Sequence, residues 1–129
     1  VINDYNGVLD NIDAAEGTQI DRNRIKGQAL ALRGFLYLHL ASCYSFAIDK
    51  DPDAVCAPIY TQSTDETIAA EGKPASSVSE VYAQSINDLE EALELIPETY
   101  VRDAKHKIDN EVVLGILSRA CLYARQINC

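Results

Sequence analysis

An apolar helical pattern runs through residues 24–46, RIKGQALALRGFLYLHLASCYSF, and it constrains the fold more than any other stretch. Apolar residues recur there at spacings of three and four, which places a stripe along one face of a helix of about six turns. This stripe consists of Ile25, Ala29, Leu32, Leu36, Leu40 and Cys43. A second stripe on a neighbouring face consists of Leu30, Gly34, Tyr37, Ala41 and Tyr44. A helix with two apolar faces must be covered on two sides, so we expect a central, nearly buried helix.

Two glycines, Gly27 and Gly34, lie inside this pattern. Each costs about 1 kcal/mol relative to alanine in a helix interior. A residue without a side chain is favoured where another backbone packs close. We therefore expect a neighbouring helix to approach the central helix at these two positions.

The segments around the central helix predict a first helix and a long loop. Residues 2–15 have helical spacing, with Asn3 or Asp4 as a candidate cap, and a turn over residues 16–21 makes a hairpin with the central helix. The apolar positions of this first helix are Ile2, Tyr5, Val8 or Leu9, and Ile12. Residues 49–76 contain three prolines and Gly72, which predicts a loop with one short extended piece over residues 57–61. A loop of this length is usually functional or packed against another part of the protein.

Two more helices follow the loop. Ser77 and Glu80 have the spacing of a capping box, which starts a helix that ends at Pro97. Its expected inner face is Val78, Val81, Tyr82, Ser85, Leu89, Ala92, Leu93 and Ile96, and its expected solvent face is Asp88, Glu90, Glu91 and Glu94. A polar connector over residues 98–108 leads to a last helix capped by Asp109 or Asn110. Its buried stripe is Val113, Ile116, Leu117, Ala120, Ala124 and Ile127, with Gly115 and Ala120 small enough for close approach.

The order of these elements predicts an all-α fold of stacked helical hairpins with one long loop. Small residues alternate with aromatic ones in two of the helices, a pattern typical of tetratricopeptide-like packing, although no strict 34-residue period can be laid over the chain. We expect residues 1–129 to form a single helical domain. The chain begins at Val1, contains no Met and stops abruptly after its last helix, so we interpret it as an excerpt of a longer protein.

Charge and hydropathy exclude several classes of function. Twenty acidic against eleven basic side chains give a net charge of −9, which repels nucleic acid and leaves no basic stripe for phosphates. No apolar run reaches the roughly 18 residues that a membrane span needs. We therefore expect no nucleic-acid partner and no membrane span in this segment.

No pattern of catalytic or metal-binding residues is present. The chain lacks a nucleophile elbow, a phosphate-binding glycine loop and a zinc-protease motif, and we predict no enzyme activity, no cofactor and no metal site. Asp49, Asp51 and Asp53 open like a calcium loop, but that loop's glycine and final glutamate are missing, which favours a solvated acidic turn. His39 is expected to be a hydrogen-bonded core or boundary residue, and His106 lies among lysines in the connector.

Two loop aromatics are the candidate ligand-binding residues. Tyr60 and Tyr100 lie outside the apolar helical stripes, so their rings could meet a ligand.

The four cysteines form no C-x-x-C pair, and we expect buried or idle thiols, with a structural disulfide as the open alternative. They are Cys43, Cys56, Cys121 and Cys129.

Three stretches in order resemble the SusD/RagB family of nutrient-binding lipoproteins of Bacteroidetes. Residues 25–46 are similar to the family's K-G-E-A-x-A-L-R-A-x-x-Y-x-x-L, and APIY at residues 57–60 takes the place of its V-P-L-V. Residues 76–97, SSVSEVYAQSINDLEEALELIP, resemble S-S-V-x-E-V-Y-x-x-I-x-x-D-L-x-x-A-x-x-x-L-P, and ILSRACLY at residues 116–123 resembles L-L-A-R-V-Y-L-Y. The chain departs from the pattern at residues 108–111, IDNE in place of A-T-K-G, and at Gly34 in place of a common alanine.

The resemblance implies a surface-exposed lipoprotein of the cell outer membrane that binds glycans or other nutrients. Members pass these to a TonB-dependent, SusC-like transporter, are not enzymes and use tetratricopeptide-like helices as a scaffold. The chain resembles only an early part of such a protein, so we expect a scaffold and not a complete binding pocket. Its exposed helix faces and the loop over residues 49–76 are then better candidates for protein contacts than for nutrient. The main alternative is a free-standing tetratricopeptide-like interaction module, and a helical hydrolase is a more distant one.

Overall fold

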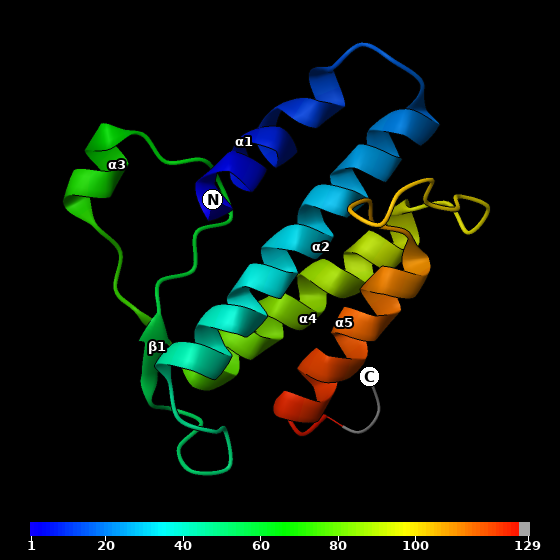
Figure 1. The fold of residues 1–129 in the computed structure, drawn as a ribbon. Helices are drawn as coiled ribbons and strands as arrows, with labels where there is room; N and C mark the ends of the chain where they lie inside the picture. The colour runs from blue at the N-terminus through cyan, green and yellow to red at the C-terminus, as the bar shows by residue number, and fades with distance from the viewer. Residues whose placement is uncertain (127–129) are drawn as a thin grey trace.

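The computed structural model describes residues 1–126, and two helical hairpins stacked on one another make up most of this part of the chain (Figure 1). The hairpin helices are α1 (Ile2–Asn11), α2 (Gln19–Tyr44), α4 (Val78–Leu95) and α5 (Asn110–Tyr123), and the 3-10 helix η1 (Ile12–Ala14) extends α1. The connecting loop holds β1 (Val55–Ala57), α3 (Glu66–Glu71) and β2 (Ser76–Ser77). The expected all-α architecture of stacked hairpins is confirmed.

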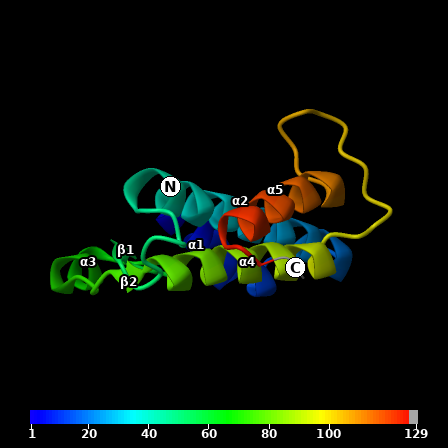
Figure 2. The ribbon, with the colours of Figure 1, turned by 90° about the horizontal axis from the view of Figure 1, so that it is seen from below.

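Helix α2 is the centre of the stack, and its most extensive contact is with α4. It begins five residues earlier than residue 24, because the Thr18 side chain accepts a hydrogen bond of 3.1 Å from the Asp21 backbone N–H and caps it. Helix α5 packs on α4, and the connector between them loops away from the helices (Figure 2).

Helix α2 buries mainly the second stripe. The sequence pattern predicted that both stripes are covered, so the expectation is wrong for much of the first stripe. Leu30, Tyr37 and Ala41 are buried, because this face lies against α4 and the loop. In the first stripe Ile25 is 42% exposed, Leu36 is only half-buried and Cys43 is exposed. The second stripe also ends early, because Tyr44 at the last turn of α2 is 75% exposed.

The glycines of α2 mark its contact with α4, as expected from the sequence. A Cβ atom added at Gly34 would lie 2.9 Å from the Ser85 carbonyl oxygen, and one at Gly27 would lie 2.7 Å from Ile96. The Ser85 hydroxyl donates a 2.7 Å hydrogen bond to the Gly34 carbonyl across the same contact. The similar expectation for Gly115 is wrong, because no atom lies within 4 Å of its Cβ position.

The cap residues predicted from the sequence are correct for α4 and α5 but not for α1. The capping box of α4 is confirmed: Ser77 N–H donates to Glu80 Oε2 at 2.8 Å, and Glu80 N–H donates to Ser77 Oγ at 3.3 Å. Asp109, rather than Asn110, caps α5 by accepting from the Val112 N–H. Helix α1 already begins at Ile2, so Asn3 and Asp4 lie inside it and neither is its cap.

The long loop contains more regular structure than the sequence indicated. Its extended piece is β1, which pairs antiparallel with β2 and lies slightly before the expected residues 57–61. Helix α3 was not expected; Asp65 caps it, and Gly72, with φ of 69°, ends it. Figure 1 shows α3 standing apart from the helical stack. Ile127, the last position of the expected stripe on α5, lies outside the described residues.

Replacing Gly34 or Gly115 by alanine should change stability in opposite directions. Gly34→Ala should destabilise the protein by about 1–3 kcal/mol, because the new methyl group overpacks the contact with α4. Gly115→Ala should stabilise it by up to about 1 kcal/mol, because it gains helix propensity with open space around it. Urea unfolding of both variants measures the two effects. A Gly34→Ala variant as stable as Gly115→Ala would show that α2 and α4 are not in close backbone contact.

Candidate functional site

Five consecutive loop residues, 60–64, are each fixed to the helices by hydrogen bonds, and we call them the strap. The strap has no regular secondary structure. Its backbone and side chains bond to side chains of α1 and α2. Since irregular loops are usually the mobile part of a fold, this density of anchors makes the strap the segment best suited to hold a fixed surface for a ligand or partner.

Helix α1 contributes three anchors spaced three and four residues apart, so they share one helix face. Asn3 accepts from the Thr64 N–H at 2.7 Å and donates to its carbonyl at 3.2 Å. Asn6, which is fully buried, donates to the carbonyls of Tyr60 and Gln62, both at 2.9 Å. The carboxylate of Asp10 accepts from the Ser63 N–H at 2.7 Å and also from its hydroxyl.

Helix α2 holds the strap through Tyr37. Its hydroxyl donates to the Tyr60 carbonyl and accepts from the Tyr60 N–H, both at 2.8 Å. The ring is fully buried, and burial raises the pKa of Tyr37 while the bond to Tyr60 opposes this rise. The phenol therefore stays protonated and acts as a fixed two-way clamp on the Tyr60 backbone.

A buried ion pair underlies these anchors. Arg33 on α2 donates two parallel hydrogen bonds, 2.8 and 2.7 Å long, to the carboxylate of Asp88 on α4. The two side chains are 7% and 3% exposed. The remaining terminal nitrogen of Arg33 donates to Asn6 Oδ1 at 2.9 Å and to the Thr61 carbonyl at 3.0 Å. One guanidinium thus joins α2, α4, α1 and the strap.

The charged side chains of Arg33 and Asp88 are used to hold the fold together. Burial alone would lower the pKa of Arg33, but the hydrogen bond and the charge of Asp88 outweigh burial, and the net effect raises it. Asp88 also accepts a 2.8 Å hydrogen bond from Gln84. Its oxygens are therefore engaged in holding the fold and are not available for acid–base chemistry.

Sequence reasoning missed this network, and it placed Asp88 wrongly on the solvent face. A signal was present. Asp88 is three residues from Ser85 and four from Ala92, both on the predicted inner face, and Arg33 lies between apolar residues of the central helix. A charged residue on each of two packed faces indicates a buried pair, because an unpaired buried charge is too costly.

The two candidate tyrosines occupy different places and do not form one site. Tyr60 belongs to the strap and lines a cavity of about 290 Å³ beside the C-terminal half of α2. Tyr100 lines a separate cavity of about 270 Å³ at the other end of α2, where the Arg24 guanidinium lies 5.2 Å from its ring centroid.

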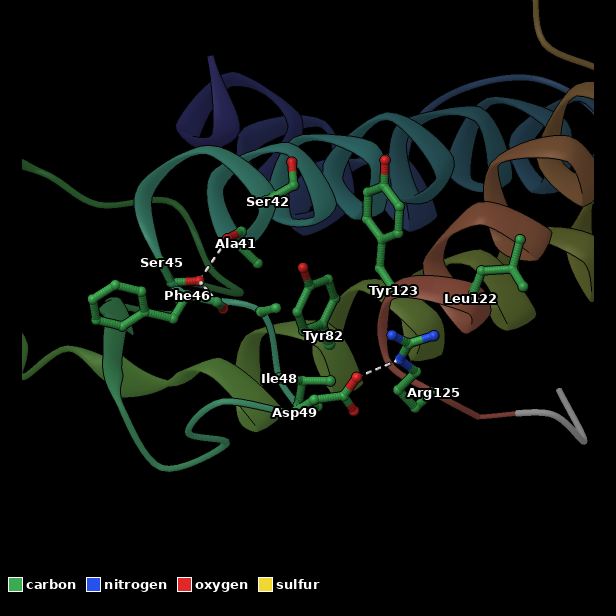
Figure 3. Close-up of a pocket in the computed structure, with 11 residues that line it drawn as sticks. Ala41, Ser42, Ser45, Phe46, Ile48, Asp49, Tyr82, Leu122, Tyr123 and Arg125 are labelled. Carbon is green, nitrogen blue, oxygen red and sulfur yellow. Dashed lines mark hydrogen bonds and ion pairs between the residues drawn. The ribbon is translucent and has the colours of Figure 1, made fainter.

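A third cavity, of about 460 Å³, lies where α2 and α5 end (Figure 3). Phe46, Tyr82 and Tyr123 line it, and a 2.7 Å ion pair between Arg125 and Asp49 spans one side. That pair is exposed, so it adds little to stability. The sequence pattern did not indicate a site at these three aromatic residues, since Tyr82 lies on the predicted inner face of its helix.

Within residues 1–126 no three or more His, Cys, Asp or Glu side chains form a cluster that could hold a metal ion. Asp49 pairs with Arg125, and Asp51 accepts from the Asp53 N–H. His39 is exposed and stacks on Phe35, with ring centroids 6.2 Å apart, so the expected core or boundary position is wrong. Within the same range no helix is long and apolar enough to cross a lipid bilayer.

The cysteines divide into two kinds. Cys43 and Cys56 are free thiols, as expected. Cys121 on α5 is disulfide-bonded, so the expectation of an idle thiol is wrong for this residue. Cys129 lies outside the described residues.

One family model matches nearly the whole chain. Residues 1–122 match the model of a SusD-like family described as starch-binding and associating with the outer membrane. No curated protein matches the chain.

Solved structures have the same fold. The chain is 98% identical, with a TM-score of 0.93, to a SusD-like carbohydrate-binding protein from Bacteroides vulgatus ATCC 8482, covering 97% of this chain and 26% of that one. A second protein from Bacteroides vulgatus ATCC 8482 is 29% identical with a TM-score of 0.84, covering 98% and 28%. A SusD superfamily protein from Bacteroides thetaiotaomicron VPI-5482 is 25% identical with a TM-score of 0.84, covering 97% and 27%. The chain thus spans about a quarter of the length of each of these proteins.

Removing the carboxylate of Asp88 should strongly destabilise the fold. Asp88→Ala leaves the Arg33 guanidinium buried without its counter-ion, which costs about 3–5 kcal/mol for a pair of this kind. Glu91→Ala, an exposed change on the same helix, should stay within about 0.5 kcal/mol of the wild type. Chemical denaturation compares them. Equal stability of the two variants would mean that the pair does not hold the helices together.

The anchor at Asp10 should show as an acidic shift in a titration. Hydrogen bonds from the side chain and backbone of Ser63 hold the pKa of Asp10 below its ordinary value of 3.8. Because the folded-state pKa is lowered, this anchor stabilises the fold above the ordinary pKa and is lost as the pH falls through the lowered one. Carboxyl NMR titration should show the low midpoint, and Ser63→Ala should move it back up. An unchanged midpoint in Ser63→Ala would show that the strap is not bound at Asp10.

Proposed function

Because residues 1–122 match its model, the chain belongs to the SusD-like family, and we propose that it is the helical scaffold of a surface lipoprotein that binds glycans or other nutrients. The lipoprotein passes its ligand to a TonB-dependent, SusC-like transporter in the outer membrane. The family match over nearly the whole chain is the observation that carries this proposal.

The packing of the described residues supports a scaffold role. The inner faces of α2 and α4 are used in contacts with one another, and the buried charges of Arg33 and Asp88 are used to hold helices and strap. Gripping a sugar normally takes exposed aromatic faces with converging polar groups. The three cavities described above are small and separate, which favours a main nutrient site in other parts of the lipoprotein.

A non-enzymatic role agrees with the positions of the acidic side chains. Glu90, Glu91 and Glu94 lie exposed on α4. Acid–base catalysis needs a cleft that shifts the pKa of one carboxyl relative to another, and these side chains have none.

The alternative, a free-standing tetratricopeptide-like interaction module, has weaker support. Each of the related structures places this fold within a chain of which it is about a quarter. A scaffold within a longer lipoprotein is expected to make up only part of its chain, whereas a free-standing module is expected to make up all of it.

Purification of the full-length protein from its native outer membrane tests the proposal. A tagged copy, extracted in mild detergent, should bring down a TonB-dependent transporter in near-equal amount and should bind a glycan by calorimetry. Incubation of the same protein with that glycan should release no shortened product. Recovery of the protein alone from a soluble fraction, or turnover of the glycan, would overturn the proposal.

A further inference from the structure

The strap presents its single aromatic ring next to a lysine. The ammonium of Lys73 lies 5.7 Å from the centroid of the Tyr60 ring, within the range of a cation–π contact. Lys73 follows α3 in the chain. Its ammonium donates a 2.6 Å hydrogen bond to the carbonyl of Ile59, the residue just before the strap. The ring and the ammonium therefore share one edge of the strap.

Lys73 differs from most cations of this acidic chain because no carboxylate in residues 1–126 forms an ion pair with it. The paired cations are Arg24, Lys26, Arg33, Arg102, Lys107 and Arg125. An ammonium has three N–H donors, and the Ile59 carbonyl takes one of them. Two donors of an exposed cation are left for a ligand.

Tyr60 also lines the 290 Å³ cavity at the strap, and Lys73 lies beside Tyr60 outside this lining. Other lining residues include Ile2 and Pro58, and most of the lining is apolar. Ligand pockets for drug-sized molecules start at about 300 Å³. This cavity therefore fits one small ring and not an extended oligosaccharide.

The position of Tyr60 is fixed before any ligand arrives. Its N–H and carbonyl bond to Tyr37, and the carbonyl also bonds to Asn6, both of which are fully buried. A residue whose backbone is held in this way loses less conformational freedom on binding than one in a free loop. All of these bonds use the backbone of Tyr60, so its ring contacts Lys73 and has no hydrogen bond that a ligand would have to replace.

We propose that Tyr60 and Lys73 form a subsite for a single uronic-acid unit of a glycan. The apolar face of the pyranose packs on the Tyr60 ring, and the sugar carboxylate accepts hydrogen bonds from the Lys73 ammonium. The net charge of −9 repels a polyanion, so the matching ligand is a mostly neutral glycan that carries an isolated uronate. This inference rests on the proposed function, since it assigns a ligand class to a glycan-binding protein.

Paired ligands and paired variants test the subsite in the full-length protein. The ligands are oligosaccharides with one uronate on a neutral xylose, galactose or glucose backbone, each compared with the same compound after reduction of its carboxylate to an alcohol. At low salt, calorimetry should show at least one uronate form binding about two- to fivefold more tightly than its reduced form, the range expected for an exposed ion pair. Added salt should remove the difference.

Lys73→Gln should abolish this preference for the carboxylate. Lys50→Gln is the matched control, because it makes the same change in charge at another lysine–aromatic pair, whose ammonium lies 3.4 Å from the Phe46 ring centroid. It should keep the preference. Tyr60→Ala should weaken binding of both ligand forms at the subsite, while an unchanged melting temperature shows that the backbone anchors of the strap remain.

The outcomes separate this inference from the proposed function. If the protein binds the reduced and uronate forms equally, or if Lys50→Gln and Lys73→Gln have the same effect, the subsite is overturned and the glycan-binding lipoprotein stands. If the protein binds no glycan, both are overturned. If the uronate preference depends on Lys73 but no transporter co-purifies, the subsite stands and the transfer to a transporter fails.

Discussion

The buried pair of Arg33 and Asp88 is the interaction on which the rest of the structure depends. Its two parallel hydrogen bonds cross the contact between α2 and α4, and its third nitrogen extends the network to Asn6 and Thr61. A buried ion pair often contributes less to stability than apolar residues of the same volume. Its effect here is to fix geometry, because only one arrangement of three helices and a loop satisfies all of its donors and acceptors.

The close approach of α2 and α4 makes that arrangement possible. Gly34 next to Arg33 has no side chain, so the α4 backbone at Ser85 can come within reach, and the Ser85 hydroxyl bonds to the Gly34 carbonyl at 2.7 Å. At this separation the short side chain of Asp88 can reach the guanidinium. The glycine therefore sacrifices helix propensity for a contact that positions the ion pair.

The same network explains how a scaffold can carry a binding feature on a loop. Loops tolerate varied sequence and expose their side chains, but their mobility weakens binding. Here the polar backbone of the strap is satisfied by buried side chains of α1 and α2, which leaves the half-buried Tyr60 on a fixed support. The helices hold the strap in place, and the strap carries the aromatic side chain that could contact a ligand.

The sequence by itself determined the four hairpin helices, their order and the capping box of α4, because apolar spacing, the Ser77–Glu80 pair and the breaks at glycine and proline act within a few residues. It also indicated the family and the close approach at Gly27 and Gly34. Only the tertiary structure decided which stripe of α2 is more deeply buried, that Asp88 turns inward, and that residues 60–64 are fixed. These depend on partners 23 to 61 residues away in the chain, from Tyr37 with Tyr60 to Asn3 with Thr64, and local spacing carries no information about such pairs.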